Sequence, residues 1–204
     1  MKKYEFTGEV KVKFGVTLKR IRAIIDFGNV KKGEIGGFIE KEENLSHENS
    51  AWIYGDAEVS GSARVYGDAW VSGDAEVSGS ARVSGSARVY GDARVYGDAW
   101  IYGDAEVSGS AWVYGDAWVS GNAEVYGNAD YMLIGQIGSR FGFTTFFKNK
   151  NKGVSVSCGC FSGTLAEFRK KVKETHGIDT KCAKVYQAAA DLAELQILGN
   201  EKAD

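Results

Sequence analysis

Proline is absent from this chain of 204 residues, and only three cysteines are present. An odd number of cysteines does not suit a disulfide framework and favours a reducing compartment. No apolar run is long enough to span a bilayer, and the chain does not open on a hydrophobic leader segment. These absences predict a soluble protein of the cytoplasm that makes no contact with a membrane.

A large net charge is also missing, because the formal total is only −2. Nothing in that total requires a nucleic acid as partner, and we expect none. The distribution is uneven: residues 131–184 contain ten Lys or Arg and three Asp or Glu, whereas residues 51–128 contain four Arg and eleven acidic residues. Any anion-binding site is therefore expected near the C-terminal end.

A six-residue repeat fills the middle of the chain. Residues 51–128 are thirteen consecutive hexads of the form A-x-V-x-G-x, in which Ile sometimes replaces Val. Alanine and valine two positions apart point to the same side of a strand, and glycine followed by Asp, Ser or Asn supplies a turn. Three such hexads form a triangular coil, and stacked coils bury the Ala/Val face. The repeat predicts a parallel β-helix.

The second and fourth positions of each hexad are expected to face outward, and all five tryptophans occupy the second position. If a coil has eighteen residues, Trp52 stacks beside Trp70, Trp100 beside Trp118, and Tyr96 beside Tyr114. Two interpretations stay open. The rings stabilise exposed strands by cross-strand stacking, or they form an interface, since Trp, Tyr and Arg dominate binding hot spots.

The flanking segments do not follow the repeat. Residues 1–38 alternate apolar and charged positions and predict an N-terminal β cap, and the β-helix is expected over residues 39–130. The glycine-rich segment 131–143 is expected to be a linker. In residues 144–204 we predict two strands, "FTTFF" and "GVSVSCGCF", then a helix from Thr164 to Thr175 and another over 181–198, a small α/β module.

The segment "DFGNVKKGEIGGFIEKEENLSHENSAWIYGDA" resembles the opening of YdcK-like hexapeptide-repeat proteins and, more closely, of phage and prophage proteins. Asn29 departs from their pattern, which has Asp there. The resemblance implies a left-handed coil and trimers that form through one prism face. The transferase label of the YdcK-like group rests on fold analogy.

Enzymes that share this fold use sets of histidines, whereas this chain has only His47 and His176. We therefore expect no catalytic residue and no cofactor. A zinc set of Cys158, Cys160, His176 and Cys182 lacks a standard spacing, so buried structural cysteines are the favoured interpretation and no metal is expected. Arg140 and the helix that begins at Thr164 form a candidate anion site.

These features predict a non-enzymatic binding protein of phage or prophage origin that acts in the host cytoplasm. We expect it to interfere with host defence by binding a host protein or a nucleotide signal, as a homotrimer. The alternatives are a hexapeptide-type acyltransferase and a structural virion protein. The predicted binding residues are Trp52, Trp70, Arg88, Arg94, Tyr96, Trp100, Trp112, Tyr114, Trp118, Arg140 and Thr164.

Overall fold

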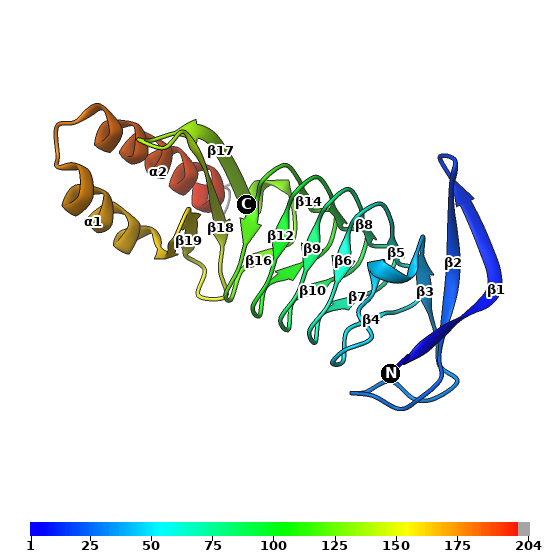
Figure 1. Ribbon diagram of the computed structural model, residues 1–204. Helices are drawn as coiled ribbons and strands as arrows, with labels where there is room; N and C mark the ends of the chain where they lie inside the picture. Colours follow the sequence, from blue (N-terminus) through cyan, green and yellow to red (C-terminus); the bar gives the residue numbers. More distant parts are fainter. Residues whose placement is uncertain (200–204) are drawn as a thin grey trace.

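Thirteen two-residue strands stack in three columns to form the middle of the molecule, as the computed structural model shows for residues 1–199 (Figure 1). The strands are β4 (Trp52–Ile53), β5 (Glu58–Val59), β6 (Arg64–Val65), β7 (Trp70–Val71), β8 (Glu76–Val77), β9 (Arg82–Val83), β10 (Arg88–Val89), β11 (Arg94–Val95), β12 (Trp100–Ile101), β13 (Glu106–Val107), β14 (Trp112–Val113), β15 (Trp118–Val119) and β16 (Glu124–Val125). All are parallel to their neighbours, so the hexads do form a β-solenoid.

The register confirms the eighteen-residue coil. Trp100 pairs with Trp118, and Trp52 pairs with Trp70, each eighteen positions apart. Three faces result. The first face contains β5, β8, β11 and β14; the second contains β4, β7, β10, β13 and β16; the third contains β6, β9, β12 and β15. The five strands of the second face correspond to a solenoid of about five turns.

The alanine and valine columns form the core, and every member from Ala51 to Val125 is fully buried. The corners need glycine for two reasons, which Gly79 illustrates. Its φ of +69° disfavours any residue with a Cβ. A Cβ would also lie 2.8 Å from the backbone nitrogen of Gly97 in the next coil. The glycine column therefore lets successive coils approach closely.

The N-terminal residues form two long strands, β1 (Tyr4–Lys13) and β2 (Val16–Ala23), and the shorter β3 (Ile35–Ile39). These strands pair antiparallel in chain order, and β3 pairs parallel with β5, so they extend the sheet of the first face. A 3₁₀ turn, η1 (Glu42–Asn44), follows.

Trp52 corrects one prediction, because it is fully buried and not outward. The N-terminal residues cover it, and the rings of Tyr4 and Phe27 lie 6.2 and 5.3 Å from the Trp52 ring. Glu58 is also buried, beneath the ammonium groups of Lys11 and Lys13. Second-position side chains of the first hexads thus face the N-terminal strands and not solvent.

The C-terminal part is an antiparallel sheet covered by two helices. Its elements are η2 (Asn128–Asp130), β17 (Tyr131–Ile137), β18 (Gly142–Lys148), β19 (Val154–Cys158), β20 (Phe161–Thr164), α1 (Leu165–His176) and α2 (Lys181–Gly199). Neither helix within the described residues 1–199 combines the length and apolarity that crossing a membrane needs. The expected α/β module is present, with four strands where we predicted two.

The segment 131–143 is not a linker. Its first half is β17, which pairs with β18 through Met132 and Leu133, and Met132 belongs to the core beneath the helices. The glycines that suggested a linker lie in the strand and in the turn after it. The division of the chain into four separate units stays a prediction.

The C-terminal sheet also closes the last coil of the solenoid. In earlier coils the backbone N–H at the second position donates to a carbonyl of the next coil, as from Trp100 to Ala117 over 2.8 Å. In the last coil side chains accept these bonds. Trp118 donates to the Thr145 hydroxyl over 2.9 Å, and Trp112 donates to the Asn128 amide oxygen over 2.8 Å. These donors of the edge therefore have partners, which matters because unpaired strand edges promote aggregation.

Candidate functional site

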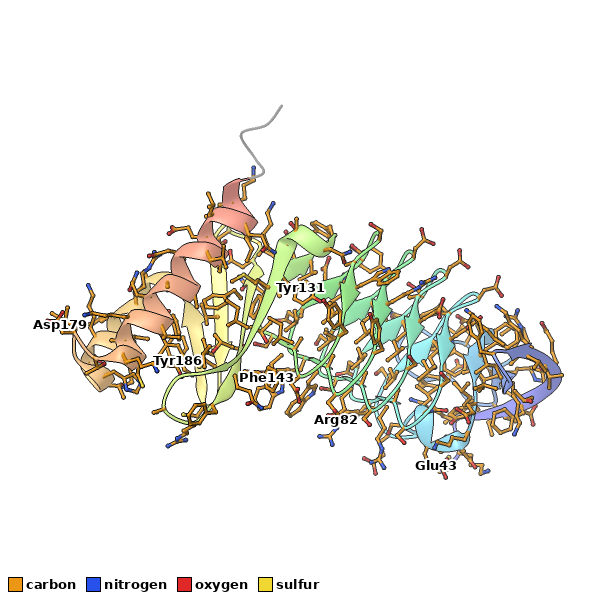
Figure 2. The ribbon with its side chains drawn as sticks, turned by 90° about the horizontal axis from the view of Figure 1, so that it is seen from above. Glu43, Arg82, Tyr131, Phe143, Asp179 and Tyr186 are labelled. Carbon is orange, nitrogen blue, oxygen red and sulfur yellow. The ribbon has the colours of Figure 1, made fainter. Side chains whose placement is uncertain are left out.

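A cavity of about 520 Å³ lies where the last coil meets the C-terminal sheet and helices. One wall comes from β15 of the third face and another from the turn between β17 and β18. Strands β18 to β20 form the floor, and α1 and α2 close the far side. Figure 2 shows Phe143 near this junction and Tyr186 on the helical side of it. The volume is in the range of small-molecule sites.

Aromatic rings dominate the cavity walls. Trp118 and Phe143 are 38% and 39% exposed, so their rings are open to a ligand. Phe168 is buried beneath the cavity and contacts the Tyr186 ring edge to face, with 5.6 Å between centroids. His176 stacks on the other side of Tyr186 at 5.7 Å. The fixed rings around Tyr186 give the cavity a rigid base.

Charged groups stand at the rim. Arg140 in the β17–β18 turn and Lys171 on α1 are exposed and line the cavity, as does Asp116 at the corner before β15. Arg140 makes no ion pair with any side chain of the described part of the chain. Among residues 1–199, Lys171 forms an ion pair with Glu174 alone, at 4.0 Å on the helix surface. Both cations are therefore available to an anion.

Burial raises the pKa of the Tyr186 hydroxyl to about 12, with further contributions from Cys158, while the nearby charge of Arg140 opposes the shift. The hydroxyl therefore stays protonated at neutral pH and can donate a hydrogen bond. It lies 3.9 Å from the Cys158 sulfur, to which Thr144 donates over 3.1 Å. Tyr186 and Cys158 form a polar spot in an otherwise aromatic floor.

The cysteines differ from our prediction that they are buried. Cys160 is exposed, because it lies in the tight turn between β19 and β20, and Cys158 and Cys182 are half-buried. Cys158, Cys160 and His176 line the cavity, whereas Cys182 does not. Within residues 1–199, no three His, Cys, Asp or Glu side chains gather closely enough to hold a metal ion.

The predicted surface residues form pairs on three different faces. The Arg88 guanidinium lies 5.1 Å from the Trp70 ring on the second face, beside a small groove of about 240 Å³. On the first face Arg94 lies 5.1 Å from the Trp112 ring. The stacking predicted between Tyr96 and Tyr114 is confirmed, at 5.5 Å and 14°. Trp100 contacts Trp118 edge to face at 5.5 Å on the third face.

These pairs do not form one surface, and of the predicted residues only Trp118 and Arg140 meet at the cavity. The most exposed rings of the solenoid lie in its last coil: Trp112 is 42% exposed, Tyr114 49% and Tyr126 43%. Trp70 and Trp100 in earlier coils are half-buried. A ring in an earlier coil is partly covered by the side chain stacked on it from the next coil. The rings of the last coil are more exposed because no further coil covers them.

Thr164 caps α1. Its hydroxyl accepts a hydrogen bond from the Glu167 backbone N–H over 3.3 Å, and the Glu167 carboxylate accepts from the Thr164 N–H over 2.8 Å. This capping box, which the sequence predicted, places a carboxylate where an anion would bind. Thr164 does not line the cavity. The binding role predicted for it is untested, but its visible role is structural.

Among the cavity residues that the sequence did not indicate are Phe143, Tyr186, Lys171 and Asp116. Tyr186 fits the helical spacing of a packing residue, and Asp116 fits the corner position of the repeat. Phe143 and Thr145 are two positions apart in β18, so both side chains lie on the side of the strand that faces the last coil. That alternation was the available signal. It does not reveal which element the strand packs against.

Comparison with known proteins agrees with the repeat. Two segments, residues 87–103 and 99–115, match the family model described as YdcK Beta solenoid repeat. Both lie in the middle coils and include β10 to β14. No curated protein matches the chain. The local match and the stacked coils together show that the chain is a β-helix repeat protein.

Proposed function

We propose that this protein binds a small ligand, without catalysis, in the cavity between the last coil and the C-terminal helices. One observation carries the proposal: open aromatic rings and Arg140, which has no ion-pair partner among residues 1–199, converge on a concave site of about 520 Å³. Small-molecule sites combine mostly apolar walls with a few placed polar groups in this way. Of the two expected partners, a nucleotide signal fits this site better than a host protein.

The absence of catalysis is supported by where the two histidines lie. His47 is at the opposite end of the molecule, where it accepts a hydrogen bond from the Lys3 backbone and contacts the Glu42 carboxylate at 2.9 Å. His176 packs flat against Tyr186 in the cavity wall. The acyltransferase alternative would need a histidine base at the edge of a coil.

The biological setting belongs to the same proposal and rests on the resemblance to phage proteins. A protein that sequesters a nucleotide signal in the host cytoplasm would interfere with a defence response. The left-handed coil is part of the proposal and rests on the resemblance alone. The capping role of β1 and β2 is supported by their place at the end of the sheet of the first face.

The proposed trimer would form through a face that carries both signs of charge. The first face offers Arg94 with Glu76, and the second offers Arg88 with Glu106. The outward second positions of the third face carry only arginine and tryptophan. At those positions the third face offers no carboxylate to pair with an arginine of a neighbouring protomer.

The test is the identification of a bound small molecule. The full chain would be purified from host lysate and denatured, and the released small molecules identified by mass spectrometry. We expect an enriched compound that Trp118→Ser no longer retains and that Trp112→Ser retains, since Trp112 is equally exposed but lies on the first face away from the cavity. Equal retention by both variants contradicts this site. Acyl transfer by the purified protein supports the acyltransferase, and its presence in purified virions supports the structural alternative.

A further inference from the structure

We propose that the cavity accepts a single nucleotide, with its base against Trp118 and Phe143 and its phosphate at Arg140 and Lys171. This inference rests on the proposed function, because it assigns a ligand class to the same cavity. Three groups of the cavity support it, and each recognises a different part of a nucleotide.

The base would stack on the open aromatic wall. Trp118 is the last ring of the third face: Trp100 covers one side of it edge to face, and no later coil covers the other. The Trp118 backbone is fixed by its hydrogen bond to Thr145, and Phe143 lies two residues before that threonine on β18. Rings held in this way suit a planar base, since every base has a face that stacks on an aromatic side chain.

The phosphate would meet the two rim cations. Arg140 has no carboxylate partner in residues 1–199, and its planar guanidinium can form paired hydrogen bonds with phosphate oxygens. Lys171 faces the same cavity from α1. The surrounding segment, residues 131–184, has ten basic and three acidic residues, so its field attracts an anion.

Asp116 distinguishes a nucleotide from other aromatic anions. It is exposed, makes no ion pair with a described residue, and lines the cavity beside Trp118. A carboxylate accepts hydrogen bonds from ribose hydroxyls and from exocyclic amino groups of bases. It would repel an aromatic carboxylate that lacks such donors. The cavity therefore offers a ring platform, two cations and one acceptor, which match a base, a phosphate and a ribose.

A nucleic acid strand does not fit the surroundings. A strand that left the cavity along the third face would pass Trp100 before it reached Arg82 and Arg64. Asp98 and Asp104 are exposed at the corners of that face. Figure 2 shows Arg82 and Phe143 on the same long side of the molecule, so a strand between them would pass these two acids. The charges favour a nucleotide and disfavour a polyanion.

Isothermal titration calorimetry of the full chain tests the inference with AMP, adenosine, inorganic phosphate and a ten-residue oligoadenylate. We expect AMP to bind at least tenfold more tightly than adenosine or phosphate, and more tightly than the oligoadenylate. Arg140→Gln should weaken AMP at least tenfold and leave adenosine unchanged, whereas Trp118→Ser should weaken both. Arg64→Gln, an exposed arginine in the first coils of the third face, is the control and should change neither.

Equal affinities for AMP and adenosine, or an Arg140→Gln variant with the affinity of the parent, would overturn the nucleotide assignment. Tighter binding of the oligoadenylate would replace it with a strand-binding site. ADP, GMP and UMP are titrated in the same way as AMP. If none of the four nucleotides binds, while the parent but not Trp118→Ser retains a non-nucleotide compound from lysate, only this inference is wrong. If no small molecule is retained at all, the proposed function fails as well.

Discussion

Trp118 donates its backbone N–H to the hydroxyl of Thr145, 2.9 Å away, and thereby joins the last coil to β18. Trp118 also lines the cavity, across from the helices α1 and α2. The element that completes the solenoid is thus also the element that builds the site. Closing the edge and forming the cavity depend on one another.

Thr145→Val tests this closure. Valine keeps the shape of threonine and suits a strand, but it leaves the partly buried N–H of Trp118 without its acceptor. We expect the free energy of unfolding to fall by about 1–3 kcal/mol, measured by urea denaturation. Thr17→Val, at an exposed position of β2, is the matched control and should change stability by less than ~0.5 kcal/mol. Equal stabilities for the two variants would show that the contact does not matter.

Truncation of a buried valine should lower the free energy of unfolding more than truncation of an exposed aromatic ring. Val95→Ala opens a cavity in the solenoid core and should cost about 1–3 kcal/mol, seen as a lower midpoint in urea, while ligand binding persists in the cold. Trp112→Ser should cost no more than about 1 kcal/mol, because serine already occupies many outward positions. The reverse order of the two losses would contradict the assigned core.

Trp52 and Trp112 occupy the same position of the repeat but should respond differently. Trp52 is fully buried against Tyr4 and Phe27, whereas Trp112 is 42% exposed. Trp52→Ala should therefore cost about 3–5 kcal/mol, and Trp112→Ala no more than about 1 kcal/mol. Thermal melts of the two variants measure the difference. Similar melting temperatures would mean that the N-terminal residues do not pack on the first coil in solution.

Lys3 should make stability depend on pH. Its buried ammonium donates to the Ala51 carbonyl over 2.8 Å, and burial lowers its pKa to about 8 while Asp68 opposes the shift. The unfolded chain, with a lysine pKa near ~10.4, holds more protons between these values, so the folded state gains stability as pH rises from 8 to about 10. Above pH ~10 Tyr4 acts in the opposite sense, because burial raises its pKa.

Urea denaturation at pH 7.5, 8.5 and 9.5 measures this effect. The Lys3→Met variant retains the cysteines and the terminal amine, which titrate in the same window. Relative to this variant, the parent should gain stability at each step. Parallel pH curves for the two proteins would show that Lys3 keeps an ordinary pKa.

Light scattering tests the proposed trimer. We expect a mass three times the 22.1 kDa of one chain at micromolar concentration. Arg88→Glu on the second face and Arg94→Glu on the first should each be compared with the parent, because each removes a cation from a mixed-charge face. Dissociation in one variant identifies the contacting face. A monodisperse monomer in the parent contradicts the trimer.

The repeat could be predicted because its physics is local. The alternation from Ala to Val, the glycine corner and the eighteen-residue period all follow from side-chain direction and turn geometry, and the capping box at Thr164 and Glu167 identified α1. Burial of Trp52 could not be predicted in this way. It depends on Tyr4, some fifty positions earlier, folding across the first coil.

The site was less predictable than the fold for the same reason. Trp118 was predicted from its position in the repeat and Arg140 from its glycine-rich segment, but the cavity exists only because β18 and β19 pack against the last coil. The glycines around Arg140 indicated a loop, although half of that segment is β17. Both the cavity and the strand β17 depend on long-range packing, which produces no periodic pattern in the sequence.

The uniform core makes the solenoid a spacer whose length can change in whole coils. Residues 81–98 are three complete hexads that neither form an ion pair with the N-terminal strands β1 and β2 nor line the cavity. Without them, the Ala, Val and Gly columns would stay in register, and the two ends would approach each other by ~4.8 Å, one strand spacing. Removal or insertion of a single hexad would also keep the columns, but it would rotate the C-terminal end and its cavity by one face relative to the N-terminal end. Insertions and deletions of one coil thus preserve the relative orientation of the two ends, and other multiples of the hexad do not.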